Sequence, residues 1–184
     1  KGRLASAIGL LNSQASGRSV FSGTATDTAP LGSVDDLLNA LQTAATGATT
    51  AGQVAAAVTT WFADPLGFGA FYQGDDPLSP TPIAAGESAD LSTTAMDQTL
   101  RDTLAGFAMA ALIDRGMPAG DPTERGRLAQ RAGQQLISTE DGRTTLAARI
   151  GTVEAHVARR RPPESDQQAC ERRLARARRA DDPD

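Results

Sequence analysis

The residues that could carry out chemistry are few, and the first of them is His156, the only histidine of the 184-residue chain. Serine and aspartate are plentiful, so a Ser-His-Asp triad could be assembled, but no Gly-x-Ser-x-Gly motif marks a nucleophile. His156 lies between Ala155 and Val157 in a helical apolar pattern, so we expect a surface or interhelical role for its imidazole. The sequence therefore predicts no enzymatic activity, and a hydrolase that uses His156 is a remote alternative.

The sequence also lacks the motifs that are typical of metal binding and phosphate binding. Asp75-Asp76 is typical of a turn, where aspartate side chains bind nearby backbone groups. Gly67-x-Gly69 is followed by neither the lysine nor the helix start of a phosphate-binding loop. The single cysteine, Cys170, excludes an intrachain disulfide and offers no second thiolate for a metal cluster. We therefore expect no cofactor and no metal.

The most strongly charged segment holds eight arginines between Arg159 and Arg179. Six acidic residues within 159–184 reduce its net charge to +2, and it contains no aromatic residue. Nucleic-acid-binding arms usually have fewer acids and often interleave aromatics, and the whole chain carries a net charge of −4. We expect a solvated helix or an assembly surface here, and no nucleic-acid partner. A helical adaptor or nucleic-acid-associated protein that uses this segment is the alternative.

The elements that would position these residues are mostly helices, because apolar residues recur at helical spacing over most of the chain. The first helix begins near Lys1, and Gly17 is predicted to end it by adopting a left-handed conformation. Residues 18–21 then alternate polar and apolar side chains, which indicates an extended segment with Ser19 on its exposed face. The apolar stripe of the first helix is Leu4, Ile8, Leu11 and Ala15.

Capping residues and glycines delimit the remaining helices. Ser33 with Asp36, and Thr50 with Gln53, are typical of helix N-termini, and Asp121 followed by proline is a third such start. Helices are expected over 33–46, 50–63, 96–115 and 121–160, the last with a weak point at residues 141–142. Between residues 67 and 92, turn signals predict an antiparallel meander of two or three short strands at 71–72, 81–84 and 88–92.

These elements predict a mainly α fold. Residues 1–20 and 93–184 would form a long antiparallel helical rod or bundle, which carries a small inserted α+β subdomain, residues 21–92. The chain is 40% hydrophobic but only 4% aromatic, which suits closely packed helices. The aromatic cluster of residues 61–72 is predicted to form a small core shared by the preceding helix and the meander, and a binding patch is the alternative. No apolar run approaches the ~18 residues of a membrane span, so we expect no membrane partner.

Several segments resemble the flagellin family, in the same order along the chain. In that family a long helix ends in an Asn-Gly-Arg-Tyr-like tetrad, which residues 11–24 resemble with Ser19 at the place of the tyrosine. Residues 71–91 resemble the family's Tyr-x-Gly-Asp turn, apolar strand and Gly-Glu turn, and residues 149–154 resemble part of its returning helix. The assembly-motif residues that the resemblance implies are Asn12, Gly17, Arg18, Phe21, Gly23, Arg149, Ile150, Gly151 and Glu154.

The resemblance implies a structural subunit of the bacterial flagellum at the hook–filament junction, with filament flagellin as the alternative. Subunits would associate by helix packing with copies of themselves, with other hook-associated proteins and with flagellin. They would act outside the cell after export by the flagellar type III route, which needs no signal peptide. The resemblance weakens after Arg161, where Pro162-Pro163 interrupts the helix. We expect the natural terminal helices to be missing, and this chain alone to be largely monomeric.

Overall fold

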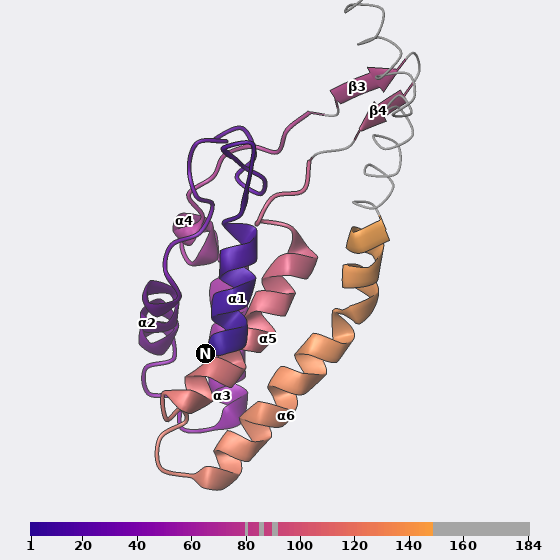
Figure 1. The fold of residues 1–184 in the computed structure, drawn as a ribbon. Helices are drawn as coiled ribbons and strands as arrows, with labels where there is room; N and C mark the ends of the chain where they lie inside the picture. The colour runs from indigo at the N-terminus through magenta and orange to yellow at the C-terminus, as the bar shows by residue number, and fades with distance from the viewer. Residues whose placement is uncertain (80, 85–86, 90–91, 149–184) are drawn as a thin grey trace, which may run out of the picture. The chain divides into compact units, whose positions relative to one another are not determined.

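The computed structural model describes residues 1–79, 81–84, 87–89 and 92–148 (Figure 1). This part of the chain is mainly helical, as the sequence predicts. Its labelled helices are α1 (Gly2–Leu11), α2 (Val34–Ala44), α3 (Ala51–Ala63), α4 (Phe68–Phe71), α5 (Gln98–Asp114) and α6 (Pro122–Ser138). After a turn at Thr139 that follows α6, residues 140–148 are again helical.

Residues 1–144 form one compact unit. The hydrophobic core of this unit draws buried side chains from α1, α2, α3, α4, α5 and α6. Core residues therefore come from both sides of the predicted boundaries at residues 20 and 92. In the predicted antiparallel rod, we expect the first helix to pack against residues 146–157. Residues 149–157 lie outside the described residues, so this contact stays a prediction.

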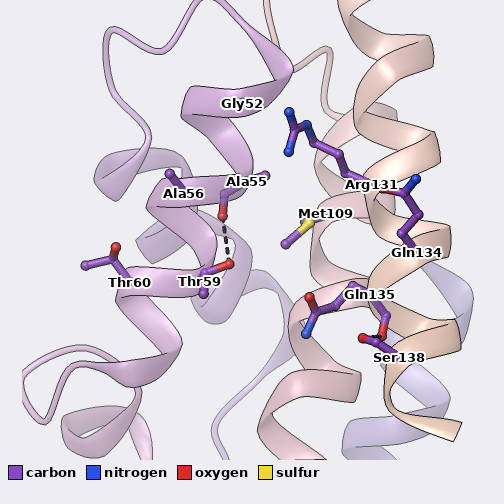
Figure 2. Close-up of a pocket in the computed structure, with 10 residues that line it drawn as sticks. All are labelled: Gly52, Ala55, Ala56, Thr59, Thr60, Met109, Arg131, Gln134, Gln135 and Ser138. Atoms are coloured by element: carbon purple, nitrogen blue, oxygen red, sulfur yellow. Dashed lines mark hydrogen bonds between the residues drawn. The ribbon is translucent and has the colours of Figure 1, made fainter.

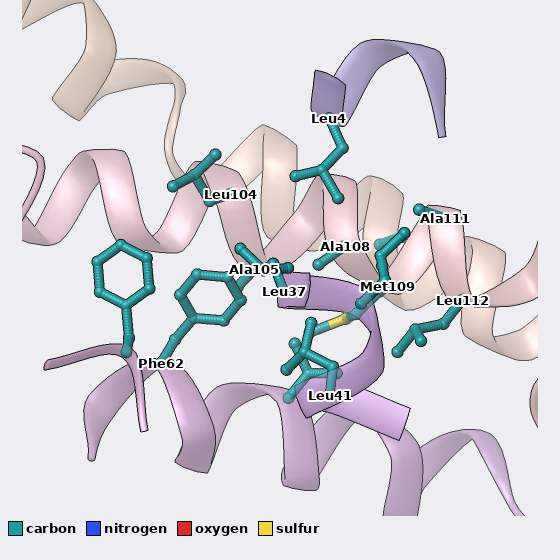
Figure 3. Packing of buried hydrophobic residues seen from close by; sticks show 14 of the residues in the cluster. Leu4, Leu37, Leu41, Phe62, Leu104, Ala105, Ala108, Met109, Ala111 and Leu112 are labelled. Atoms are coloured by element: carbon teal, nitrogen blue, oxygen red, sulfur yellow. The ribbon is translucent and has the colours of Figure 1, made fainter. Parts of the chain in front are cut away.

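Helix α5 lies at the centre of this core. It contacts α1, α2, α3 and α6, and most of its small residues are buried, including Ala105, Ala108 and Ala111. Figure 3 shows large side chains of the other helices, such as Leu4 of α1 and Leu41 of α2, gathered around these alanines. Small residues permit helix axes to approach closely, so each neighbour packs its larger side chains against α5.

The helix N-termini follow the capping residues predicted from the sequence. The Ser33 hydroxyl accepts a 3.1 Å hydrogen bond from the Asp36 amide. Thr50 and Gln53 form the complete reciprocal capping box of α3, and Asp121 caps α6. Helix α5 ends at Asp114, close to the predicted end at residue 115. Just beyond it, Gly116 adopts a φ of +82°, as expected of a glycine that follows a helix.

The predicted end of the first helix is wrong. Helix α1 ends at Leu11, and the chain then forms a hairpin of β1 (Gln14–Ala15) and β2 (Arg18–Ser19). Leu4, Ile8 and Leu11 are buried as predicted, whereas Ala15 is exposed because it belongs to the hairpin. Gly17 does adopt a positive φ, +77°, but in the turn of this hairpin.

The predicted meander is confirmed only in its later part. Strands β3 (Thr81–Ala84) and β4 (Glu87–Ala89) pair antiparallel. Phe71, predicted in a strand, instead ends the single turn of α4, and Tyr72 makes only an isolated bridge to Leu31. The aromatic core forms between α3 and α4, where the rings of Phe62 and Phe68 lie 5.0 Å apart.

The carboxylate of Glu124 joins α6 to α3. Its Oε2 accepts a hydrogen bond of 2.7 Å from the backbone amide of Ala51, in the first turn of α3, and its other oxygen pairs with Arg127. The Ala51 amide, and after it Arg127, hold the pKa of Glu124 below its usual value. The negative charge is favourable beside the positive end of the α3 dipole.

We predict that Glu124→Gln lowers stability at neutral pH and that this difference disappears in strong acid. The folded-state pKa is lower than the unfolded one, so the carboxylate stabilises the fold above the unfolded pKa and loses this contribution as pH falls through the folded value. Urea unfolding at a series of pH values measures the difference. The control Asp27→Asn, on an exposed loop, should leave stability at pH 7 unchanged. A Glu124→Gln deficit that persists at low pH would contradict the charge-based explanation.

We also predict that Gly106→Val destabilises the protein by about 1–3 kcal/mol through overpacking. A Cβ atom at Gly106 of α5 would lie 2.8 Å from two side-chain atoms of Leu136 of α6. The control is Gly126→Val on the exposed side of α6, where a Cβ would meet nothing within 4 Å. Thermal unfolding of the two variants should show a loss only for Gly106→Val, and equal melting temperatures would contradict this close approach.

Candidate functional site

The motif residues predicted in the N-terminal half all lie in residues 12–31, which we call the motif loop. This loop leaves the end of α1 and leads to α2 (Figure 1). It contains Asn12, Gly17, Arg18, Phe21 and Gly23. The other predicted motif residues, Arg149, Ile150, Gly151 and Glu154, lie outside the described residues, as do His156 and the arginine-rich segment.

Asn12 closes the base of the motif loop. Its Nδ2 donates a 2.9 Å hydrogen bond to the carbonyl of Leu31, and the Leu31 amide donates a 3.0 Å bond to its Oδ1. A carboxamide can make this reciprocal pair because it holds a donor and an acceptor side by side. Leu31 is buried in the core. This pair of hydrogen bonds, which we call the brace, therefore fixes the end of α1 to a chain segment 19 residues further on.

The hairpin of the motif loop turns at Ser16 and Gly17. Both have positive φ, 52° and 77°, which is the signature of a two-residue type I′ turn. Beyond the turn Arg18 is exposed. Ser19 is only 5% exposed, whereas Val20 is 45% exposed. The expectation of an exposed Ser19 is therefore wrong, because the register of this short hairpin turns Ser19 inward.

The second half of the motif loop is bonded to the turn that follows α4. The amide of Asp75 donates to the carbonyl of Ser22, and that of Thr24 to Asp76, both at 2.9 Å. The Tyr72 hydroxyl donates to the carbonyls of Asp75, at 3.2 Å, and Phe21, at 3.4 Å. Burial raises the pKa of this hydroxyl, which keeps it a neutral donor.

Two glycines allow these backbones to meet. A Cβ on Gly23 would lie 2.3 Å from the Asp76 carbonyl oxygen, and one on Gly74 would lie 2.2 Å from the Tyr72 hydroxyl. The Phe21 carbonyl also accepts a 2.9 Å bond from the amide of Ala95, just before α5. The motif loop thus joins α1, the turn after α4 and the segment before α5 through backbone contacts.

Polar side chains at and beside the motif loop bind other parts of the fold. Asn12 of the loop, and Tyr72 of the turn packed on it, are engaged with backbone carbonyls and amides. Within residues 1–79, 81–84, 87–89 and 92–148, no group of three or more metal-binding side chains occurs. In the same residues, no helix is long and apolar enough to cross a membrane. These contacts hold the motif loop in a fixed position on the fold.

The sequence did not reveal a groove between α3 and α6, which Figure 2 shows. The groove has a volume of about 600 Å³. The α3 side bears only small side chains, with Met109 of α5 between the two helices, and the α6 side bears long polar ones. The recurrence of small residues along α3 was the sequence feature that could have indicated this groove. The lining residues are Gly52, Ala55, Ala56, Thr59, Thr60, Met109, Arg131, Gln134, Gln135 and Ser138.

Comparisons of this chain with protein-family models, with curated proteins and with solved structures found no match.

We predict that Gly23→Ala destabilises the protein more than Gly17→Ala. Both glycines have positive φ, so alanine costs about 1–2 kcal/mol of backbone strain at either position. Only at Gly23 would the new Cβ also meet backbone, at 2.3 Å and 2.4 Å from two carbonyl oxygens, whereas Gly17 has open space. Thermal unfolding measures the difference, and a loss at Gly17 equal to that at Gly23 would refute the close contact between the motif loop and residues 75–76.

Proposed function

We propose that this chain is a structural subunit of the bacterial flagellum, located at the hook–filament junction, and that it has no enzymatic activity. The observation that carries the proposal is the direct bonding of two segments that the flagellin resemblance singles out separately. These are residues 21–24 and the Tyr-x-Gly-Asp turn at 72–75. They are about 50 residues apart in sequence, and each depends on a glycine to approach the other.

The roles of the motif residues also support a structural subunit. Asn12 braces the loop base, Gly17 makes the turn, and Gly23 admits a neighbouring backbone. These are positioning roles, and they suit a protein whose function is to hold a surface in a fixed shape. The exposed Arg18 is the motif side chain of the loop that is available to a partner.

The proposal includes the long antiparallel helical rod expected from the sequence, formed by residues 1–20 and 93–184. Through this rod, copies of the chain would associate with each other, with other hook-associated proteins and with flagellin. Helices of this kind are stable only when their apolar faces are covered by a partner. The proposed location is outside the cell, after export by the flagellar type III route.

The experiment is deletion of the coding sequence in the bacterium that carries it. A junction subunit is needed to attach filaments, so we expect cells with hooks but without filaments in electron micrographs, and flagellin released into the medium. The alternative, filament flagellin, predicts bare hooks with no flagellin in the medium. Mutant cells with normal filaments would refute both assignments.

We predict that Asn12→Asp lowers the stability of the protein by about 1–3 kcal/mol, because the Leu31 carbonyl then loses its donor and faces a carboxylate. When the deletion strain is complemented with this variant, it should lose filaments at a lower temperature than when it is complemented with the parent protein. The control is Asn39→Asp, where the Oδ1 that accepts from Arg115 is kept. Unfolding curves and filament counts measure the effect, and a variant indistinguishable from the control would contradict the role of the brace.

A further inference from the structure

A leucine on the turn after α3 projects into solvent. Leu66 is 86% exposed, the highest value among the large hydrophobic side chains of the described residues. Its turn is fixed: the Leu66 amide donates to Oδ1 of Asp64 at 2.9 Å, and the Gly67 amide donates to the Asp64 carbonyl at 3.0 Å. A Cβ on Gly67 would lie 2.3 Å from the Trp61 carbonyl oxygen, so the turn is pressed against the end of α3. The fold therefore presents an apolar side chain next to a carboxylate in a defined geometry.

The groove between α3 and α6 is complementary to this turn, because it offers apolar surface and a positive charge. Its volume of about 600 Å³ leaves room for a leucine, and the exposed Ala56 supplies apolar surface on the α3 side, with Ala55 and Met109 largely buried at the base (Figure 2). Arg131 extends from α6 toward the start of α3, where its Nη2 lies 3.8 Å from the position that a Cβ on Gly52 would take. In the described part of the chain, no hydrogen bond or ion pair is found for this guanidinium.

The distribution of charge favours an acidic partner for this groove. Residues 1–144 contain fifteen acidic and nine basic residues. Three of the nine, Arg125, Arg127 and Arg131, lie on α6, so α6 is a basic surface on an acidic unit. Another copy of an acidic unit is attracted to such a surface, and opposite charges select the orientation in which the two meet.

The turn of one copy cannot fill the groove of the same copy. Asp64 lies at the end of α3, whereas Arg131 reaches the start of α3, and the 13 residues of this helix span about 20 Å. The geometry points to a second copy, and we propose that the Asp64–Leu66 turn of one copy docks into the α3–α6 groove of the next. Leu66 would lie against Ala56, above the largely buried Ala55 and Met109, and the Asp64 carboxylate would pair with Arg131.

This inference rests on the proposed function, since it assigns a contact between copies of a self-associating subunit. The contact is heterologous, with different surfaces on the two copies, so repetition gives a ring or a helix of subunits. A single leucine and one ion pair bury much less than the roughly 1,200–2,000 Å² of a stable interface. The docking therefore sets the relative orientation of copies that other surfaces hold together.

The test is cross-linking of this purified chain in a Cys170→Ser background, because a cross-linker also traps contacts that are too weak to hold a dimer together. One copy carries Ala63→Cys beside the turn and the other carries Gln134→Cys in the groove, and both are mixed with a short bismaleimide. We expect a cross-linked heterodimer, which should be absent when Thr28→Cys replaces Ala63→Cys. Arg131→Glu in the groove copy should reduce the yield about tenfold by opposing two carboxylates, whereas Arg131→Lys should retain most of it.

A second pair of variants tests the turn. Leu66→Ser should reduce cross-linking to a similar extent, whereas Leu66→Met should keep it, and circular dichroism should show that each variant remains folded. Equal yields from the Thr28→Cys control, or yields unaffected by both Arg131→Glu and Leu66→Ser, would overturn the docking. This outcome is distinct from failure of the flagellar assignment, because the latter is decided by the deletion strain and not by purified protein.

Discussion

The fold of residues 1–144 depends on the close packing of helices against α5. Its alanines and Gly106 leave little side chain between the helix axes, so α1, α2, α3 and α6 can all contact one helix. This solution suits a chain with few aromatic residues, because contact area is gained by proximity instead of by large side chains. It also makes the position of α6 sensitive to a single added methyl group, at Gly106 beside Leu136.

Local signals predicted much of this structure. Ser33, Thr50 with Gln53, and Asp121 mark helix starts because the capping side chain binds a backbone amide only two or three residues away. Such interactions depend on neighbouring residues and can be inferred without knowledge of the fold. The end of α1 was missed for a related reason: Gly17 needs a positive φ both in a helix stop and in a type I′ turn, and the sequence alone does not separate the two.

Long-range pairing could not be inferred in the same way. Helical periodicity shows which face of α2 or α3 is apolar, but it does not show that this face meets α5. The burial of Ser19 instead of Val20 has a similar cause, since the register of a two-residue strand is set by its partners. At the candidate site, the resemblance picked out Asn12, residues 21–24 and the Tyr72 turn. The bonds of Asn12 to Leu31, and those between residues 21–24 and residues 72–76, became evident only in the structure.

The reciprocal bonds between Asn12 and Leu31 separate the tip of the motif loop from its base. Residues 27–29 are exposed, and the chain on both sides of them is already held, by the brace at residues 12 and 31 and by the bond from Ser19 to the Thr26 carbonyl. Lengthening the tip would add only loop entropy, about 0.6 kcal/mol for each doubling of its length. The tip is thus a place where a peptide tag or a small domain could be inserted while α1, α2 and α5 keep their arrangement.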